Sequence, residues 1–271
     1  MSPKPAAEVR PSRLGRLVNE RALLGMAGVA GVLIVWEAAV RLGLVKSVLI
    51  SRPSAVAAAG LDAFTSGTIF PAIGATLIVW VAGFTLASVA GIALGLLGGI
   101  SLRFRYLVTP WLNISYVAPD LAFVPILILW FGIGLGFKIV LVFITAVFYI
   151  AINTLAGVEA SEAKFLTVAH SFNASRLLVM RTVTLPGSVP YIITGLRQGA
   201  SRAIVAVIVA EFVSSTQGIG FMIAVSGQFL ETANVMFGIV LLAVFGIAVN
   251  EVLTRIDRRF DAWRPARNAN R

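Results

Sequence analysis

The 271-residue sequence contains no cysteine, only one histidine, and few acidic side chains. Without cysteine the chain has no disulfide, no thiolate nucleophile and no cysteine-ligated zinc. With His170 as the single histidine, clusters of histidine ligands for a metal are also excluded. The four aspartates are widely spaced, and no G-x-x-x-x-G-K-[ST] motif is present to bind ATP. These absences argue against an enzyme and against a pump that hydrolyses ATP itself.

Charged residues are scarce, at 13% of the chain, whereas 58% of the residues are hydrophobic. Globular domains in water carry about a quarter charged residues, because polar side chains must cover their surface. The chain is therefore expected among membrane lipids. Its net charge of +10 does not indicate nucleic acid, since the basic residues lie in short gaps between apolar runs and do not gather on one soluble face.

Six apolar stretches are long enough to cross a hydrocarbon core, which requires about 20 residues per helix. They cover residues 22–40, 77–100, 108–131, 137–156, 191–213 and 233–253. The sequence thus predicts an all-α integral membrane protein with six transmembrane helices over 22–253. The first stretch is too long for the core of a signal peptide, so we expect a retained anchor.

The Lys and Arg residues predict the orientation, because cytoplasmic segments are enriched in them. With the N-terminus inside, 16 of the 22 lie in inner segments and two lie within the fifth stretch. The outer segments hold Arg41, Lys46, Arg52 and Lys138. We therefore expect a cytoplasmic N-terminal segment, 1–21, and a basic cytoplasmic tail, 254–271. In the outer loop, the apolar residues 55–64 predict a helix on the membrane surface.

The second stretch places small residues at a strict spacing of four. They are Gly83, Ala87, Gly91, Gly95 and Gly99. On a helix they form one stripe that lets a second backbone approach closely. The second backbone belongs either to the same chain or to another subunit.

The third stretch contains three prolines and one carboxylate. Pro110, Pro119 and Pro125 each remove a backbone donor and kink or break the helix, which is tolerated at membrane depth only inside protein or along a water-filled cavity. Asp120 either faces such a cavity or lies near the inner interface. The third stretch is thus a candidate lining of a pathway.

The fifth stretch adds intramembrane charges. Arg202 lies about 18 Å along the helix from Pro190, and Asp120 reaches a similar depth in the third stretch. We hypothesise that the two pair across the bundle. The candidate pathway residues are Pro119, Asp120, Arg202 and Glu211.

Residues 157–190 form the longest cytoplasmic connection. Four apolar residues at helical spacing predict a short amphipathic helix: Phe165, Val168, Ala169 and Phe172. Asn173 suits a left-handed turn, and Ser175 is a plausible N-cap of a second helix that runs to Pro186. This helix pair either docks on a partner or lies on the inner leaflet.

The same loop resembles the permease subunits of ABC importers of the nitrate/sulfonate/taurine branch. That family carries E-A-A, three residues, G, nine residues, I, one residue and L-P. Aligned on Leu185 and Pro186, the sequence has Thr-Val-Ala at 167–169, Asn173 for the glycine and Val183 for the isoleucine. Asn is the next-best residue for a left-handed turn, whereas Thr167 removes a charge that the family is expected to place against its ATPase. The flanking matches are Pro125, Trp130 to Gly134, Asn173 to Arg176, Pro190 to Arg197, Ala210-Glu211 and Gly218 to Gly220.

The resemblance implies a type I importer fold like that of the methionine importer, and a homodimer in the bacterial inner membrane. Two ABC ATPase subunits would grip the loop, and an extracytoplasmic binding protein would deliver a nitrate-, sulfonate- or taurine-like anion or a small nutrient. No cofactor is expected in this chain, because the partner subunit binds ATP. The ATPase-coupling residues implied are Thr167, Val168, Ala169, His170, Asn173, Ala174, Ser175, Arg176, Leu185 and Pro186.

An ion-gradient-driven secondary transporter is the alternative. It requires a relay of intramembrane carboxylates. The candidates are Glu37, Asp120, Glu211 and Glu251, which are scattered over four stretches. ATP hydrolysis by a co-purified complex would distinguish the importer from this transporter and from a membrane enzyme.

Overall fold

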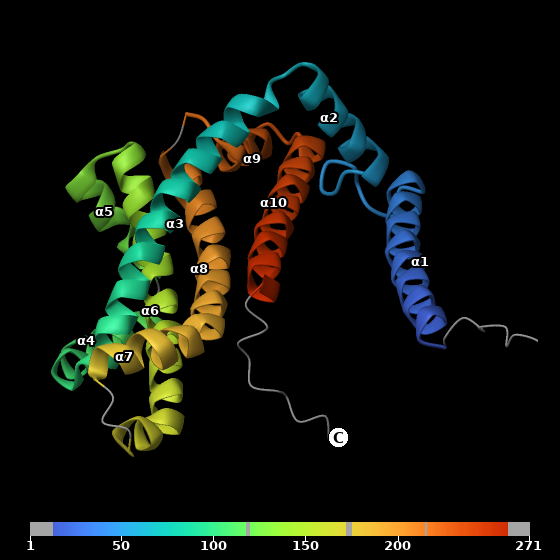
Figure 1. The fold of residues 1–271 in the computed structure, drawn as a ribbon. Coiled ribbons are helices and arrows are strands. Elements are labelled where there is room, and N and C mark those ends of the chain that lie inside the picture. The colour runs from blue at the N-terminus through green and yellow to red at the C-terminus, as the bar shows by residue number, and fades with distance from the viewer. Residues whose placement is uncertain (1–12, 118–119, 172–174, 215, 260–271) are drawn as a thin grey trace, which may run out of the picture.

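The computed structural model describes residues 13–117, 120–171, 175–214 and 216–259, and every regular element among them is helical (Figure 1). The helices are α1 (Arg13–Arg41), α2 (Pro53–Thr65), α3 (Ile69–Ile100), α4 (Leu102–Val117), α5 (Val124–Phe131), α6 (Leu135–Ser171), α7 (Arg176–Val179), α8 (Leu185–Ser214), α9 (Ile219–Gln228) and α10 (Thr232–Arg259). A 3-10 turn, Asp120–Phe123, precedes α5, and a π-helix, Met180–Thr184, joins α7 to α8. The prediction of an all-α fold is confirmed.

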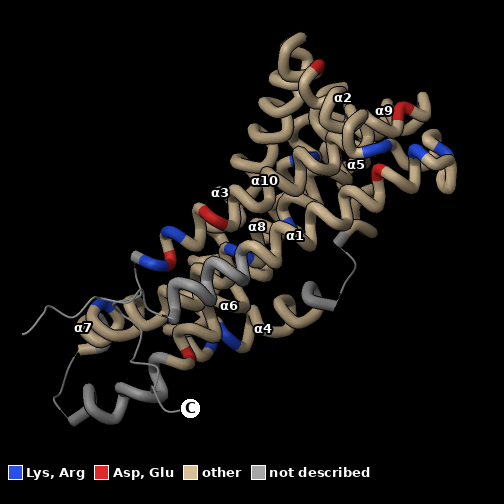
Figure 2. Tube along the Cα trace, turned by 90° about the vertical axis from the view of Figure 1, so that its right-hand side faces the viewer, with Lys and Arg blue, Asp and Glu red and all other residues tan. Residues whose placement is uncertain are grey.

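Within these residues, five helices are long and apolar enough to cross a membrane, where the sequence predicts six. They are Leu23–Arg41, Ile69–Ile100, Leu135–Ala160, Met180–Val213 and Thr232–Arg258. Figure 2 shows how few charged residues interrupt the long helices. The helix expected over 55–64 also forms, as α2.

The stretch 108–131 does not form the single helix that six continuous spans require. It is divided between the end of α4, the 3-10 turn and α5, whose eight residues are too few to span. Pro125 lies in the first turn of α5, where its missing N–H costs least. The predicted interruption is thus found, and neither α4 nor α5 alone is long enough to span the membrane.

The core of the bundle is α6, which packs between α3 and α8 (Figure 1). The small-residue stripe of α3 faces α6 of the same chain. A Cβ added at Gly83 would lie 2.6 Å from the Val142 Cβ, and one at Gly91 would lie 2.8 Å from the Ile150 Cβ. The close approach predicted for the stripe is therefore made within one chain.

The order of the glycine contacts along α3, α6 and α8 shows in which direction each helix runs relative to the others. Gly83 and Gly91 of α3 meet Val142 and Ile150 of α6, so the two helices run in the same direction. The segment between them, residues 101–134, must therefore return along the bundle as the broken α4–α5 path. Helix α8 runs opposite to α6, because a Cβ added at Gly195 would lie 2.9 Å from the Cβ of Asn153, while Gly199 lies beside Ile150, one turn earlier in α6.

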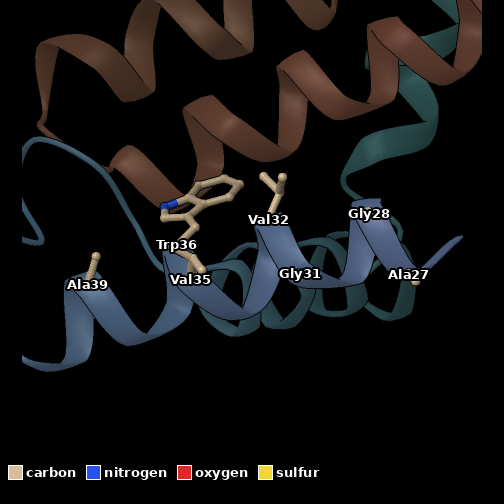
Figure 3. Close-up of a pocket in the computed structure, with 7 residues that line it drawn as sticks. All are labelled: Ala27, Gly28, Gly31, Val32, Val35, Trp36 and Ala39. Atoms are coloured by element: carbon tan, nitrogen blue, oxygen red, sulfur yellow. The ribbon is translucent and has the colours of Figure 1, made fainter. Parts of the chain in front are cut away.

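Helix α1 lies at the edge of the bundle and contacts it through α2. The Glu37 carboxylate joins them, accepting from the Ser54 backbone N–H at 3.0 Å and from the Ser54 hydroxyl at 2.7 Å. Figure 3 shows that Val32 and Trp36 project from α1 beside its glycines. Most of the α1 surface is exposed, as expected of a helix that faces lipid.

Candidate functional site

The predicted coupling residues fall in two places: residues 167–176 cover the end of α6 and the start of α7, and Leu185 and Pro186 begin α8. We call residues 167–186 the predicted coupling segment. Residues 167–170, Thr to His, belong to the last turns of α6, which runs without a break from the core into this segment. The first amphipathic helix is thus the continuation of α6, where a separate helix was expected. The side chains of 161–171 and of Arg176 lie outside the described part, as do Asn173 and Ala174 altogether.

Ser175 has the N-cap role that its sequence position predicts. Its hydroxyl oxygen accepts a hydrogen bond from the Leu178 backbone N–H at 3.3 Å, in the first turn of α7. This bond satisfies a donor that the start of a helix leaves open.

The second helix does not stop at Pro186. It widens into the π-helix, in which the Leu185 N–H bonds the Met180 carbonyl, and it continues directly as α8. Pro186 then lies in the first turn of α8, where a proline is tolerated. The Ser188 hydroxyl donates to the Thr184 carbonyl at 2.6 Å in this turn. The coupling segment is therefore helical on both sides of residues 172–174.

The candidate pathway residues are only partly described. Asp120 begins the 3-10 turn, but its side chain and Pro119 lie outside the described part. Arg202 is exposed, and its guanidinium carbon lies 4.8 Å from the centre of the Tyr149 ring. The Asp120–Arg202 pair remains a prediction.

The fourth candidate, Glu211, forms the most elaborate polar site of the described bundle. Its side chain is 1% exposed. One carboxylate oxygen accepts from the Thr76 hydroxyl of α3 at 2.8 Å, and the other accepts from the Gly220 N–H of α9 at 2.7 Å. The Thr76 hydroxyl oxygen also accepts from the Ile219 N–H at 2.9 Å. Glu211 thus holds the first turn of α9 against α3 and α8.

Two glycines let α9 approach this carboxylate. Gly218 has φ +125°, and a Cβ there would collide with the Glu211 carboxyl group. A Cβ at Gly220 would lie 2.9 Å from the Glu211 Cβ. The sequence contains both pieces, the buried acid and G-I-G, but nothing in it pairs Thr76 with Glu211. Only the general rule that a buried carboxylate needs donors points to such a partner.

Two ion pairs join helices away from Glu211, toward the other end of the bundle. Arg105 of α4 lies 3.1 Å from Glu159 of α6, and Arg197 of α8 lies 3.5 Å from Asp257 of α10. Among the residues that the structure describes, no group of three or more His, Asp and Glu side chains is placed to hold a metal ion.

The fold is similar to that of solved ABC importers. A chain of the MetNI methionine ABC transporter in an inward-facing conformation superposes with a TM-score of 0.60 at 18% identity, covering 69% of this chain and 93% of that chain. A chain of an amino acid ABC transporter, in a crystal structure with histidines, has a TM-score of 0.61 at 15% identity and covers 73% and 97%. The fold is that of a type I importer membrane domain.

Residues 87–264 match the family of binding-protein-dependent transport system inner membrane components, so the chain belongs to this family. The taurine transport system permease protein TauC of Escherichia coli is 30% identical over 251 residues, 91% of each chain. The nitrate import permease protein NrtB of Leptolyngbya laminosa is 33% identical over 197 residues, covering 72% and 71%. The resemblance to ABC importer permeases of this branch is thereby confirmed, and the chain is an ABC importer permease and is not itself an enzyme.

Proposed function

We propose that this chain imports a small oxyanion, a sulfonate or nitrate, as a homodimer that binds two ABC ATPase subunits and receives solute from an extracytoplasmic binding protein. The observation that carries the proposal is similarity over most of the chain to permeases named for taurine, aliphatic sulfonates and nitrate. These solutes share one chemistry, a compact oxyanion. In this scheme both termini are cytoplasmic, as the Lys and Arg distribution predicts.

The continuity of α6 supports an ATP-driven mechanism. One helix of 37 residues extends from the packed core to the coupling segment. A displacement imposed at its far end by the ATPase would move the core residues of α6, and α3 and α8 with them, as one body. ATP is bound and hydrolysed by the partner subunits.

The carboxylates give little support to the alternative, a transporter driven by an ion gradient. Glu37 is held by Ser54 and Arg41, and Glu251 pairs with Arg255 at 3.0 Å. Glu211 accepts the two hydrogen bonds described above. A proton or sodium relay needs carboxylates that share a path. These three lie on α1, α8 and α10, each with its own partners, and the side chain of the fourth candidate, Asp120, lies outside the described residues.

The test is uptake by vesicles that contain the permease, its ATPase and its binding protein. ATP-dependent accumulation of ethanesulfonate, taurine or nitrate is expected, and it should persist when ionophores dissipate the proton and sodium gradients. Uptake that requires a gradient but no ATP would contradict the proposal.

A further inference from the structure

The end of the bundle that contains Glu211 also contains a cavity of about 410 Å³. Its walls come from the start of α3, the start of α6 and the connection between α8 and α9. Most of the lining is apolar or small: Pro71, Gly74, Ala75, Ile78, Val79 and Leu135. Three polar residues complete it, namely Lys138, Thr216 and Gln217. Such a mixture of apolar wall and few polar groups is typical of small-molecule sites.

Lys138 is the only lysine in the five described spanning helices. A charged side chain in a membrane helix is costly and usually faces a partner or a pathway. Lys138 is attracted to Glu211, yet the Glu211 oxygens already accept from Thr76 and Gly220. An ammonium group donates up to three hydrogen bonds, so Lys138 can serve Glu211 and a ligand at the same time.

We propose that this cavity is an oxyanion-binding site on the transport path, where the Lys138 ammonium receives the sulfonate or nitrate group. Thr216 and Gln217 supply a hydroxyl and an amide donor from the α8–α9 connection. The apolar wall accommodates the short alkyl chain of a sulfonate. This inference rests on the proposed function and names the part of the chain that recognises the charge of its solute.

The position of the cavity suits a site that solute meets early. It lies at the beginning of α6, whereas the coupling segment lies at the other end of the same helix. By the Lys and Arg distribution this is the outer end, where a binding protein delivers solute. Gln217 lies three residues before Gly220, whose N–H donates to the Glu211 carboxylate at 2.7 Å, so a ligand held by Gln217 would lie beside the contact that fixes the start of α9.

The experiment must separate ligand binding by Lys138 from a role as mere counter-ion of Glu211. The complete complex in vesicles is assayed for ATP-dependent uptake of ethanesulfonate and nitrate. Lys138→Arg should retain uptake within about threefold, and Lys138→Met should lower it at least tenfold. The double variant Lys138→Met/Glu211→Gln removes both charges and should not recover the uptake, because the ammonium group that binds the oxyanion is still missing.

Thr216→Val provides a second, milder variant that keeps both charges. It should raise the KM for ethanesulfonate about threefold to tenfold with little change in kcat. Thr65→Val is its matched control, because Thr65 is exposed in α2 and its hydroxyl bonds only carbonyls of its own helix; uptake should be unchanged.

The outcomes are distinct. Restored uptake in the double variant would show that Lys138 only balances Glu211, and normal uptake by both Lys138→Met and Thr216→Val would equally overturn the site. In either case the proposed function stands. If the unmodified complex accumulates neither anion, the proposed function fails, and the oxyanion site fails with it.

Discussion

Among single residues, Glu211 shows how a buried carboxylate in a membrane protein can hold separate helices together. Its carboxylate accepts hydrogen bonds from the Thr76 hydroxyl and the Gly220 N–H, buried donors that would otherwise lack an acceptor. A helix of ten residues such as α9 cannot span the bilayer, so it depends on contacts of this kind for its position.

Replacing Glu211 by Ala should therefore destabilise the subunit by about 1–3 kcal/mol, because it leaves buried donors without an acceptor. The measurement is thermal unfolding in detergent. Glu251→Ala is the matched control, since that carboxylate pairs with Arg255 on an exposed face, where such pairs contribute little. Equal losses for the two variants would contradict this role of Glu211.

Gly218→Ala tests the contact between Glu211 and the connection from α8 to α9. The residue has φ +125°, and its Cβ would collide with the Glu211 carboxyl group, so a loss of about 1–3 kcal/mol is expected. Gly227→Ala lies in α9 with its nearest neighbour 3.9 Å away and should be neutral or slightly stabilising. A Tm for Gly218→Ala as high as that of Gly227→Ala would rule out the collision.

The predicted Asp120–Arg202 pair requires a charge-swap test. If the two residues pair, Asp120→Asn and Arg202→Gln should each impair folding or transport, because each removes one charge of the pair, and the double variant Asp120→Arg/Arg202→Asp should recover part of the loss. A double variant no better than the product of the single variants would remove the pair. The Tyr149 ring, which already contacts Arg202, would then be its main partner.

Among the helices, α6 is the element that links the core to the coupling segment. Its 37 residues extend about 55 Å at 1.5 Å per residue. Glycines of α3 and α8 let both neighbours approach it to backbone distance. A helix held this tightly on two sides transmits a displacement along its axis, because a packed core does not deform continuously.

Variants of the coupling segment test this link. Ala169→Glu and Asn173→Pro should uncouple or release the ATPase, while delivery by the binding protein is untouched. Asn173→Gly should be tolerated, whereas Asn173→Val should not, if residue 173 has the left-handed conformation that its sequence predicts. Thr167→Glu should preserve or strengthen ATPase association if the ATPase groove keeps a cationic partner.

The measurement is the amount of ATPase that co-purifies with each variant, together with solute-stimulated ATP hydrolysis. Asn173→Gly is the control, because it changes the same position and should be expressed and co-purify with the ATPase as the unmodified permease does. If both Ala169→Glu and Asn173→Pro keep full ATPase binding and transport, the segment does not couple to the ATPase and is only a helix at the surface.

Across the whole molecule, the parallel run of α3 and α6 requires the broken α4–α5 path to recross the bundle. The passes along the bundle are then α1, α3, the α4–α5 path, α6, α8 and α10. Their number is even, which is consistent with both termini on one side of the membrane. The charge distribution predicts that this side is the cytoplasm.

Thiol labelling tests the orientation in a chain that has no cysteine of its own. Cysteine introduced at Ser66, which is exposed at the end of α2, should react with an impermeant reagent in intact cells. Cysteine at Ser161 should react only after lysis. Labelling at Ser161 in intact cells would reverse the orientation and remove the coupling segment from the ATPase side.

The sequence alone determines the helical membrane class, because 20-residue apolar runs have no other stable state in lipid. It also determines where the N-cap lies at Ser175 and where helices come close along the α3 stripe, since both depend on local residue types. It further indicates that prolines interrupt the third stretch. The coupling role of residues 167–186 stays a prediction from their pattern of small and turn residues.

Only the tertiary structure decides which distant residues meet. Thr76 and Glu211 are 135 positions apart, and no local pattern relates them, because their contact follows from how α3, α8 and α9 pack. Packing also decides that the α3 stripe faces α6 of its own chain, and that α6 continues through the predicted loop helix. Each of these depends on long-range burial, which periodicity along a single helix does not encode.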